Sequence, residues 1–268
     1  MNRNSNTYTV IYATVLTVLV AILLTVAAVG LAPQQKANKD NEKKMQILSS
    51  ISSVLGQKVT MDNAAEIWSQ YNMDQNKLTV GIDGQVIEGV DPFEIAIKAQ
   101  FKGGVVSDGA QLPVYVANVN GQNYYIMSLY GAGLWGPIWG YISVGPDGSE
   151  IAGACFDHES ETAGLGALIK DDPNFALSFV GKHVYKADGE FAPVQVLKAG
   201  KNPANGADKV DAISGATKTT TGVSHMIGES LTGYEAFLAG VRESAKAPAQ
   251  DSVQVAADST NVEPITAE

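Results

Sequence analysis

The amino-acid sequence predicts an α+β protein: a single N-terminal transmembrane helix, then one domain with a mostly antiparallel sheet and packed helices. Three observations support this prediction. An uncharged apolar run lies near the N-terminus, hairpin signals follow one another in the central third, and helical patterns stand before and after them. With 268 residues, of which 45% are hydrophobic, the chain can bury one sizeable core, so we expect one soluble domain.

The apolar run, residues 9–31, is about 23 residues long, and a helix needs roughly 20 residues to cross a bilayer. A cleaved secretory signal is the competing interpretation. Its apolar region would have roughly 7 to 15 residues and would end at an Ala-x-Ala site, which does not follow cleanly here. We therefore expect a membrane-spanning helix, preceded by a short N-terminus of residues 1–8.

Basic residues beside this run favour a cytoplasmic domain. Arg3 stands alone before the run, whereas four lysines follow it, and basic residues collect on the cytoplasmic side of membrane helices. These are Lys36, Lys39, Lys43 and Lys44. Acidic residues in the same stretch leave the orientation poorly determined.

Between the run and the sheet the pattern is mainly helical. From Asn41 to about Leu55, Ile47, Ile51 and Val54 recur on one face, which predicts a stalk helix within a linker of residues 32–60. A helix that binds a partner is an equally open interpretation of this stretch.

The soluble domain is predicted to span residues 61–245. It begins with a helix around Ala64–Tyr71, followed by strand character from Leu78 to Ile87. Asp91 and Pro92 predict the start of another helix through Ile97, because proline suits the first helical position.

Three hairpins are predicted in the central part of the chain. The strongest signal is Asn120-Gly121, a dipeptide that favours tight hairpin turns, and the others surround Gly145–Gly148 and Ala187–Glu190. The predicted strand pairs are Val114–Val119 with Gln122–Leu129, Ile138–Val144 with Glu150–Phe156, and Lys182–Lys186 with Pro193–Leu197.

The last helix is predicted to start at Thr217, after a loop from Asp211. Apolar residues from Val223 to Leu238 recur at helical spacing, and Ser214 or Thr217 would cap the helix. A helix start has free N–H groups and a partial positive charge, and Gly215 lets a ligand approach the backbone, so a phosphate would fit here. Beyond Gly240 the composition changes, and residues 246–268 are expected to form a disordered acidic tail.

Asp211-x-x-Ser214-Gly215-Ala216-Thr217, followed by Lys218-Thr219-Thr220, resembles the flavinylation signature of FMN-binding domains. These domains occur in the C subunit of Na+-translocating NADH:quinone oxidoreductases and in the related G subunit of Rnf complexes. The resemblance implies one covalent FMN, whose phosphate is esterified to the hydroxyl of Thr217. It also implies that a flavin transferase recognises Asp211, Ser214, Gly215 and Ala216.

Two further loops match the family. Tyr130–Tyr141 combines four glycines with four aromatic residues and contains a Gly-Leu-Trp segment at Leu134 and Trp135, where a planar ring could lie. The interpretation that Trp135 and Trp139 fill the core is equally open. The second loop resembles the family's Glu-Thr-x-Gly-Leu-Gly segment, which implies that it lies at the flavin. The flavin-site residues implied are Thr217, Ser214, Gly215, Ala216, Lys218, Thr219, Leu134, Trp135, Glu161, Thr162, Gly164 and Leu165.

Composition excludes several other classes of function. A formal net charge of -10 argues against nucleic acid as a partner, because phosphate backbones need a basic surface. The single cysteine, Cys155, excludes an internal disulfide and is expected to be a small buried residue. His158, Glu159 and Glu161 lack the spacing of a helical metal site, while His183 and His225 are interpreted as structural residues.

The resemblance implies an electron carrier that is anchored in the bacterial inner membrane by one span, with its soluble domain in the periplasm. Its partners would be the other membrane and cytoplasmic subunits of the reductase, between which it relays electrons toward quinone, and the flavin transferase during maturation. A flavoprotein like the Rnf G subunit is an alternative, although residues 64–104 make the chain longer than that protein usually is. A non-redox anchored extracytoplasmic binding module is the alternative from a different class.

Overall fold

The computed structural model describes residues 6–258, and their side chains as far as Lys246. The chain divides into two compact units, one that ends at Lys44 and one that begins at Met45. Helix α1, Asn6–Ser49, runs through the first unit and into the second without a break. By length and composition, α1 is the one helix of the described chain that could cross a membrane, and its apolar side chains, such as Leu24 and Val29, are exposed.

The end of α1 belongs to the soluble domain rather than to a separate stalk. Ile47, Leu48 and Ile51 are fully buried, in one apolar cluster with Trp68 and Tyr115. The sequence predicted that the domain begins at residue 61, but the compact unit begins at Met45. Periodicity in the sequence showed an apolar face correctly, but it contains no information about which part of the fold covers that face.

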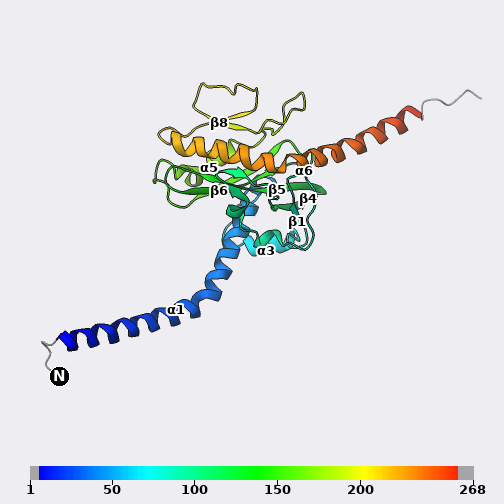
Figure 1. The fold of residues 1–268 in the computed structure, drawn as a ribbon. Coiled ribbons are helices and arrows are strands. Elements are labelled where there is room, and N and C mark those ends of the chain that lie inside the picture. Colours follow the sequence, from blue (N-terminus) through cyan, green and yellow to red (C-terminus); the bar gives the residue numbers. More distant parts are fainter. Residues whose placement is uncertain (1–5, 259–268) are drawn as a thin grey trace, which may run out of the picture. The chain divides into compact units, whose positions relative to one another are not determined.

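A five-stranded antiparallel sheet forms the centre of the domain, in the order β1-β4-β5-β6-β7 (Figure 1). β4 pairs with β5 and β6 pairs with β7, both antiparallel, so the first two predicted hairpins are confirmed. The turn between β4 and β5 has positive φ at Asn120 and Gly121, 53° and 82°. Opposite Ser143 and Val144, β7 contains one extra residue, Ala152, which forms a β-bulge. The strands are β1 (Lys77–Val80), β4 (Leu112–Val119), β5 (Gln122–Ala132), β6 (Pro137–Val144) and β7 (Ile151–His158).

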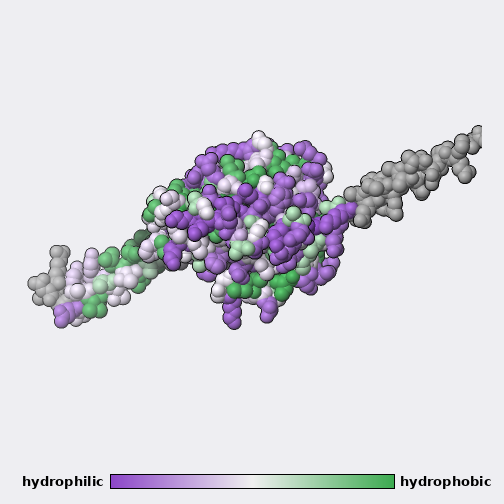
Figure 2. Space-filling view, turned by 90° about the horizontal axis from the view of Figure 1, so that it is seen from above, coloured by the Kyte–Doolittle hydropathy of each residue, from purple (hydrophilic) through white to green (hydrophobic). Residues whose placement is uncertain are grey.

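Helices cover both faces of this sheet (Figure 1). Neighbouring residues alternate between two apolar clusters, so that Val114 and Ile142 lie in one cluster and Tyr115 and Tyr141 in the other. The first cluster includes residues of α6 (Thr217–Asp258) and α5 (Pro173–Leu177), with α4 (Leu168–Asp171) beside them. The second includes α3 (Ala64–Gln70), the end of α1 and, partly buried, the end of α2 (Ser52–Leu55). The outer surface seen in Figure 2 is mainly hydrophilic, with small separate apolar patches.

The segment between α3 and β4 is less regular than predicted. The predicted strand from Leu78 ends at Val80, because Asp83 and Gly84 form a turn that brings Val86 back to bridge Val80. The predicted helix starts correctly, with the Asp91 side chain accepting a hydrogen bond from the Phe93 N–H, but it ends after one 3-10 turn. The short elements here are η1 (Pro92–Glu94), η2 (Ile97–Gln100), β2 (Phe101–Lys102) and β3 (Val105–Val106).

The third predicted hairpin is wrong. Lys186 and Glu190 do close a turn, but beyond the single bridge between Tyr185 and Phe191 the chain leaves this pairing. β8 (Gln195–Leu197) instead pairs in parallel with β9 (Lys209–Asp211). The Val184 N–H donates to the Ser149 carbonyl and His183 bridges Glu150, so the predicted first strand of this hairpin pairs with the chain just before β7 instead. As a result, β9 leads directly into the loop that precedes α6.

Two other expectations concern Cys155 and the C-terminus. Cys155 is half-buried on β7, and burial followed by the nearby charge of Asp157 raises the pKa of its thiol to about 12. Helix α6 continues to Asp258, past the predicted start of the tail at residue 246. Residues 259–268 of that predicted tail lie outside the described part of the chain.

Two glycines of α6 give opposite predictions for the same substitution. A Cβ on Gly222 would lie 2.3 Å from the Ala132 carbonyl oxygen, whereas a Cβ on Gly228 would meet no atom within 4 Å. We expect Gly222→Ala to lower the free energy of unfolding by about 1 to 3 kcal/mol, because α6 would have to move away from β5. Gly228→Ala should raise it by about 0.5 to 1 kcal/mol, because alanine favours helix. Denaturant unfolding of the two variants measures both, and equal effects would contradict the close packing at Gly222.

Candidate functional site

A groove of about 160 Å³ lies at the start of α6. Three segments that are distant in the sequence line it: the β5–β6 loop, the β7–α4 loop and the first turn of α6. All of the predicted flavin-site residues except Ser214, Trp135 and Gly164 are in the lining. The lining residues are Leu134, Glu161, Thr162, Leu165, Gly166, Gly215, Ala216, Thr217, Lys218 and Thr219.

The first turn of α6 presents an exposed hydroxyl to this groove. Helix α6 begins at Thr217 as predicted, and Gly215 just before it has φ +80°. Thr217 is exposed, and its hydroxyl makes no hydrogen bond with any described residue; the same holds for Ser214, so neither side chain provides the expected cap. The Ala216 N–H donates to the Ile213 carbonyl and the Thr220 N–H to the Ala216 carbonyl, so the N–H groups of residues 217–219 are those that a helix start leaves unpaired.

Glu161 joins the three segments of the groove. Its side chain is buried, and its Oε1 accepts a hydrogen bond from the Trp135 N–H at 2.9 Å. Its Oε2 accepts one from the Thr219 hydroxyl at 2.6 Å, which attaches the β7–α4 loop to the first turn of α6. A carboxylate at a helix N-terminus is also favoured by the helix dipole. Glu161 thus holds the groove together and also lies in its lining, so its contact with the flavin, which the resemblance implies, stays a prediction.

Two glycines make room for this carboxylate. A Cβ on Gly133 would lie 2.4 Å from Glu161 Oε1, and a Cβ on Gly166 would lie 2.4 Å from its Oε2. Real Cβ atoms do not approach oxygen that closely, so any other residue would displace Glu161. Both glycines belong to the Gly-Leu-Trp and Glu-Thr-x-Gly-Leu-Gly motifs found in the sequence, but neither was among the residues predicted to bind the flavin.

Three large apolar side chains are exposed around the groove. Leu134, Trp135 and Leu165 are 51%, 65% and 43% exposed. Trp135 therefore does not fill the core, which was one of the two interpretations left open. Trp139 is half-buried, and its indole N–H donates to Gln46 Oε1 at 3.3 Å. Exposed apolar groups around a polar helix start are typical of a site that receives a partly aromatic ligand.

Two predicted residues, Ser214 and Asp211, lie outside the lining of the groove, whereas Lys218 is part of it. Lys218 is exposed next to Thr217 and forms no ion pair within the described residues. Ser214 and Asp211 line a neighbouring cavity of about 600 Å³ on the other side of the loop. His183 Nδ1 lies 3.1 Å from Asp208 and His225 is exposed on α6, which fits the structural roles predicted for these two histidines, while His158 Nδ1 accepts from the Glu161 N–H at 3.1 Å.

Comparisons with known proteins agree with this geometry. The FMN-binding domain family model matches residues 133–232, a range that starts in the β5–β6 loop, ends within α6 and includes every lining residue of the groove. The C subunit of the Na+-translocating NADH-quinone reductase of Vibrio vulnificus is 30% identical over 244 residues, with 85% of this chain and 92% of the relative covered. The chain belongs to the C-subunit family of these reductases.

Solved structures of this family share the fold. The crystal structure of the C subunit from Parabacteroides distasonis ATCC 8503 is 44% identical, with a TM-score of 0.68 over 78% of this chain and 96% of that one. Shewanella oneidensis NqrC is 22% identical, with a TM-score of 0.61 over 77% of this chain and 99% of that one, and supports the fold alone. The predicted α+β fold and family are both confirmed.

The role of Glu161 can be separated from that of its exposed neighbour Glu159. Glu161→Met keeps the length of the side chain but removes both accepting oxygens, so the Trp135 N–H and the Thr219 hydroxyl both lose their acceptor. We expect a loss of about 1 to 3 kcal/mol in the free energy of unfolding, because a buried polar group is left unpaired. Glu159→Met should change it by less than about 0.5 kcal/mol. Equal stability of the two variants in urea would show that Glu161 does not hold the groove together.

Proposed function

We propose that this chain is the FMN-carrying, electron-transferring subunit of a Na+-translocating NADH-quinone reductase, with one FMN joined through a phosphoester to Thr217. The observation that carries this proposal is the free, exposed Thr217 hydroxyl in a groove at the start of α6. Family membership supports the class of function, because the relatives are named as the C subunit of this reductase.

The surroundings of Thr217 suit a phosphodiester. The N–H groups of the first helical turn and the helix dipole favour a negative group here. Lys218 opposes that dipole in the protein alone, since a cation in the first turn is unfavourable, and a phosphate beside it would reverse this effect. A neutral or anionic residue would be the better choice if no anion were bound at this position.

The groove's rim suits a planar ring. Leu134, Trp135 and Leu165 offer exposed apolar surface close to the attachment point. A ring laid against them would cover this surface, exclude water and stack on the indole of Trp135. Glu161 joins the two loops that carry these side chains, because it stands in one loop and accepts from the Trp135 N–H of the other, so the ring's position is set before it is attached.

Bound FMN would supply one-electron transfer, and this chain's own residues would tether, orient and shield it. The chain would relay electrons between other subunits toward quinone without contacting NADH. During maturation a flavin transferase would recognise Asp211, Ser214, Gly215 and Ala216, of which Asp211 and Ser214 are exposed. The Thr217 oxygen would bond to the phosphorus of an activated FMN donor, whose leaving phosphate would depart while the hydroxyl proton passes to solvent.

We further propose that α1 anchors the chain in the bacterial inner membrane and that the domain lies in the periplasm. A tethered cofactor suits that location, because a dissociated FMN would be lost outside the cytoplasm. Ion translocation needs polar groups in several membrane spans, and the described chain has one candidate span, so pumping would occur in other subunits.

Intact mass and in-gel flavin fluorescence test the attachment. Chain produced together with its flavin transferase should fluoresce and be heavier by one phosphoester-linked FMN. Thr217→Ala should lose the label completely, because the only proposed acceptor oxygen is gone. Thr221→Ala is the matched control: its hydroxyl, one turn further along, bonds only the Thr217 carbonyl at 2.7 Å. This variant should keep the label in full.

The same measurement separates the alternatives. A label that persists in Thr217→Ala would contradict the proposed attachment. A wild-type chain that is folded but unlabelled would contradict the electron-carrier function and favour a non-redox binding module.

Labelling from outside the cell tests the orientation. Lys201 is exposed on the soluble domain, so Lys201→Cys in a Cys155→Ala background places a single thiol in solvent. We expect a membrane-impermeant maleimide to label this variant in intact cells as strongly as in lysed cells. Labelling only after lysis would place the domain in the cytoplasm, as the lysines after the apolar run suggest.

A further inference from the structure

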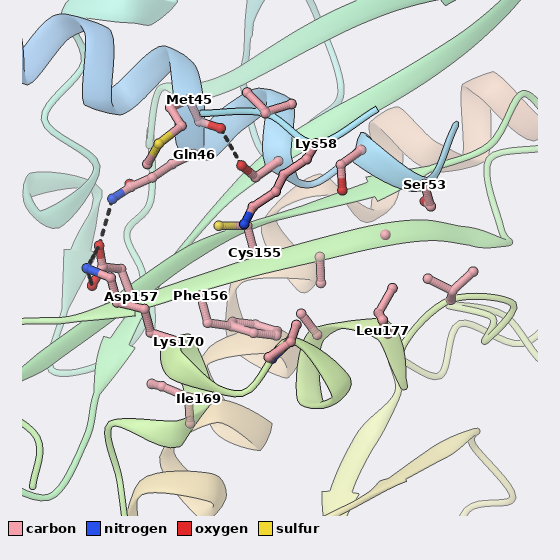
Figure 3. A pocket seen from close by; sticks show the side chains of 18 of the residues that line it. Met45, Gln46, Ser53, Lys58, Cys155, Phe156, Asp157, Ile169, Lys170 and Leu177 are labelled. Carbon is pink, nitrogen blue, oxygen red and sulfur yellow. Dashed lines mark hydrogen bonds and ion pairs between the residues drawn. The ribbon is translucent and has the colours of Figure 1, made fainter. Parts of the chain in front are cut away.

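A second groove, of about 770 Å³, lies along β7 and shares no lining residue with the groove at Thr217. Figure 3 shows how it is built: β7 forms the floor, the end of α1 and the segment after it form one wall, and α4 and α5 form the other. Nothing in the electron-carrier function uses it.

The floor of this groove is a free sheet edge. β7 is the last strand of the sheet, with β6 on its inner side. At its beginning the outer side is occupied, because the Ile151 N–H donates to the Lys182 carbonyl at 2.7 Å and the Gly181 N–H donates to the Ile151 carbonyl at 2.9 Å. The Ala152 carbonyl then accepts from the Ser53 hydroxyl. From residue 153 to 157 no described segment pairs with this edge.

The direction of the backbone groups follows from Gly140 on β6. A Cβ on Gly140 would lie 2.3 Å from the Cys155 carbonyl oxygen, so that carbonyl points inward to β6. Backbone groups of successive strand residues point to opposite sides, so those of Ala154 and Phe156 point outward into the groove. They form a row of donors and acceptors that an extended chain can pair with.

The two walls differ in chemistry. Leu177 and Val180 on the α5 side are 55% and 41% exposed, which gives apolar surface for alternate side chains of a bound strand. Lys58 on the other wall is exposed and forms no ion pair within the described residues.

The end of the groove is closed by a neutralised carboxylate. Asp157 is buried, 2.8 Å from the Lys170 ammonium, and accepts from Gln46 Nε2 at 2.7 Å. Because Asp157 and Lys170 neutralise each other, Lys58 gives the groove a net positive charge. The whole chain, in contrast, has a formal charge of -10.

We propose that the β7 groove binds an extended segment of another subunit of the reductase, which adds a strand to β7. An acidic side chain of that segment pairs with Lys58, and apolar side chains contact Leu177 and Val180. A strand is favoured over a helix, because only an extended backbone can bond the outward groups of Ala154 and Phe156. The inference rests on membership of a family of complex subunits and not on FMN at Thr217.

Hydrogen exchange on the purified, assembled complex tests the strand pairing. Exchange at the amides of Ala154 and Phe156 should be slower by about tenfold or more in the complex than in the isolated protein. Lys58→Glu should restore fast exchange in the complex preparation, because it places like charges opposite each other. Lys98→Glu reverses the charge of another exposed lysine, on η2, and should leave the slow exchange unchanged. Unchanged exchange in the wild-type complex would overturn the proposal.

Crosslinking identifies the occupant. A photo-crosslinking amino acid at Leu177 should link to an acidic segment of another subunit of the complex, while one at the exposed Ala99 should not link to that segment. A link from Leu177 to lipid, to a second copy of this chain or to a helix would overturn the proposal. The Thr217→Ala complex should show the same slow exchange, so loss of the flavin and failure of the groove are distinguishable.

Discussion

The site depends on one buried carboxylate that holds two loops and the first turn of α6 in place. Glu161 receives one hydrogen bond from the loop after β5 and one from the first turn of α6, while it stands in the loop after β7 itself. Because Glu161 is at the centre, Gly133 and Gly166 have to be glycines, and the side chains that surround Thr217 come from segments that are far apart in the sequence. Without this carboxylate the loops would have no common fixed point.

The sheet makes this arrangement possible because helices cover both of its faces. On one face α6 begins at the groove and continues across the apolar cluster, where Tyr234 is fully buried and its hydroxyl donates to the Pro113 carbonyl. β9 pairs in parallel with β8, and the chain runs from the end of β9 through a short loop to the start of that helix. The position of Thr217 is therefore set by a long packed helix and by a strand that leads into it. A flexible loop would not define the position of a tethered group equally well.

Local signals in the sequence were enough for the parts of the fold that local chemistry decides. Asn120-Gly121 predicted its hairpin because few other dipeptides adopt positive φ at both positions, and the loop before Thr217 predicted a helix start. Long-range pairing was not accessible in this way. The segment after Ala187-Asp-Gly-Glu190 looked like a hairpin strand, but it pairs with residues that follow it. Likewise, the apolar face at Ile47 was visible, whereas its burial against Trp68 was not. The groove residues came from motif resemblance, and the function of Glu161 as a link between loops required coordinates.

The thiol of Cys155 has a consequence for a protein that handles electrons. Burial raises the pKa of this thiol far above neutral pH, so little of it is thiolate, which is the form that reacts with oxidants and disulfides. The chain's sole sulfhydryl is thus chemically quiet. Two copies that meet in an oxidising compartment would have little tendency to become covalently joined, and reactive oxygen formed near a reduced cofactor would find no ready target on this strand.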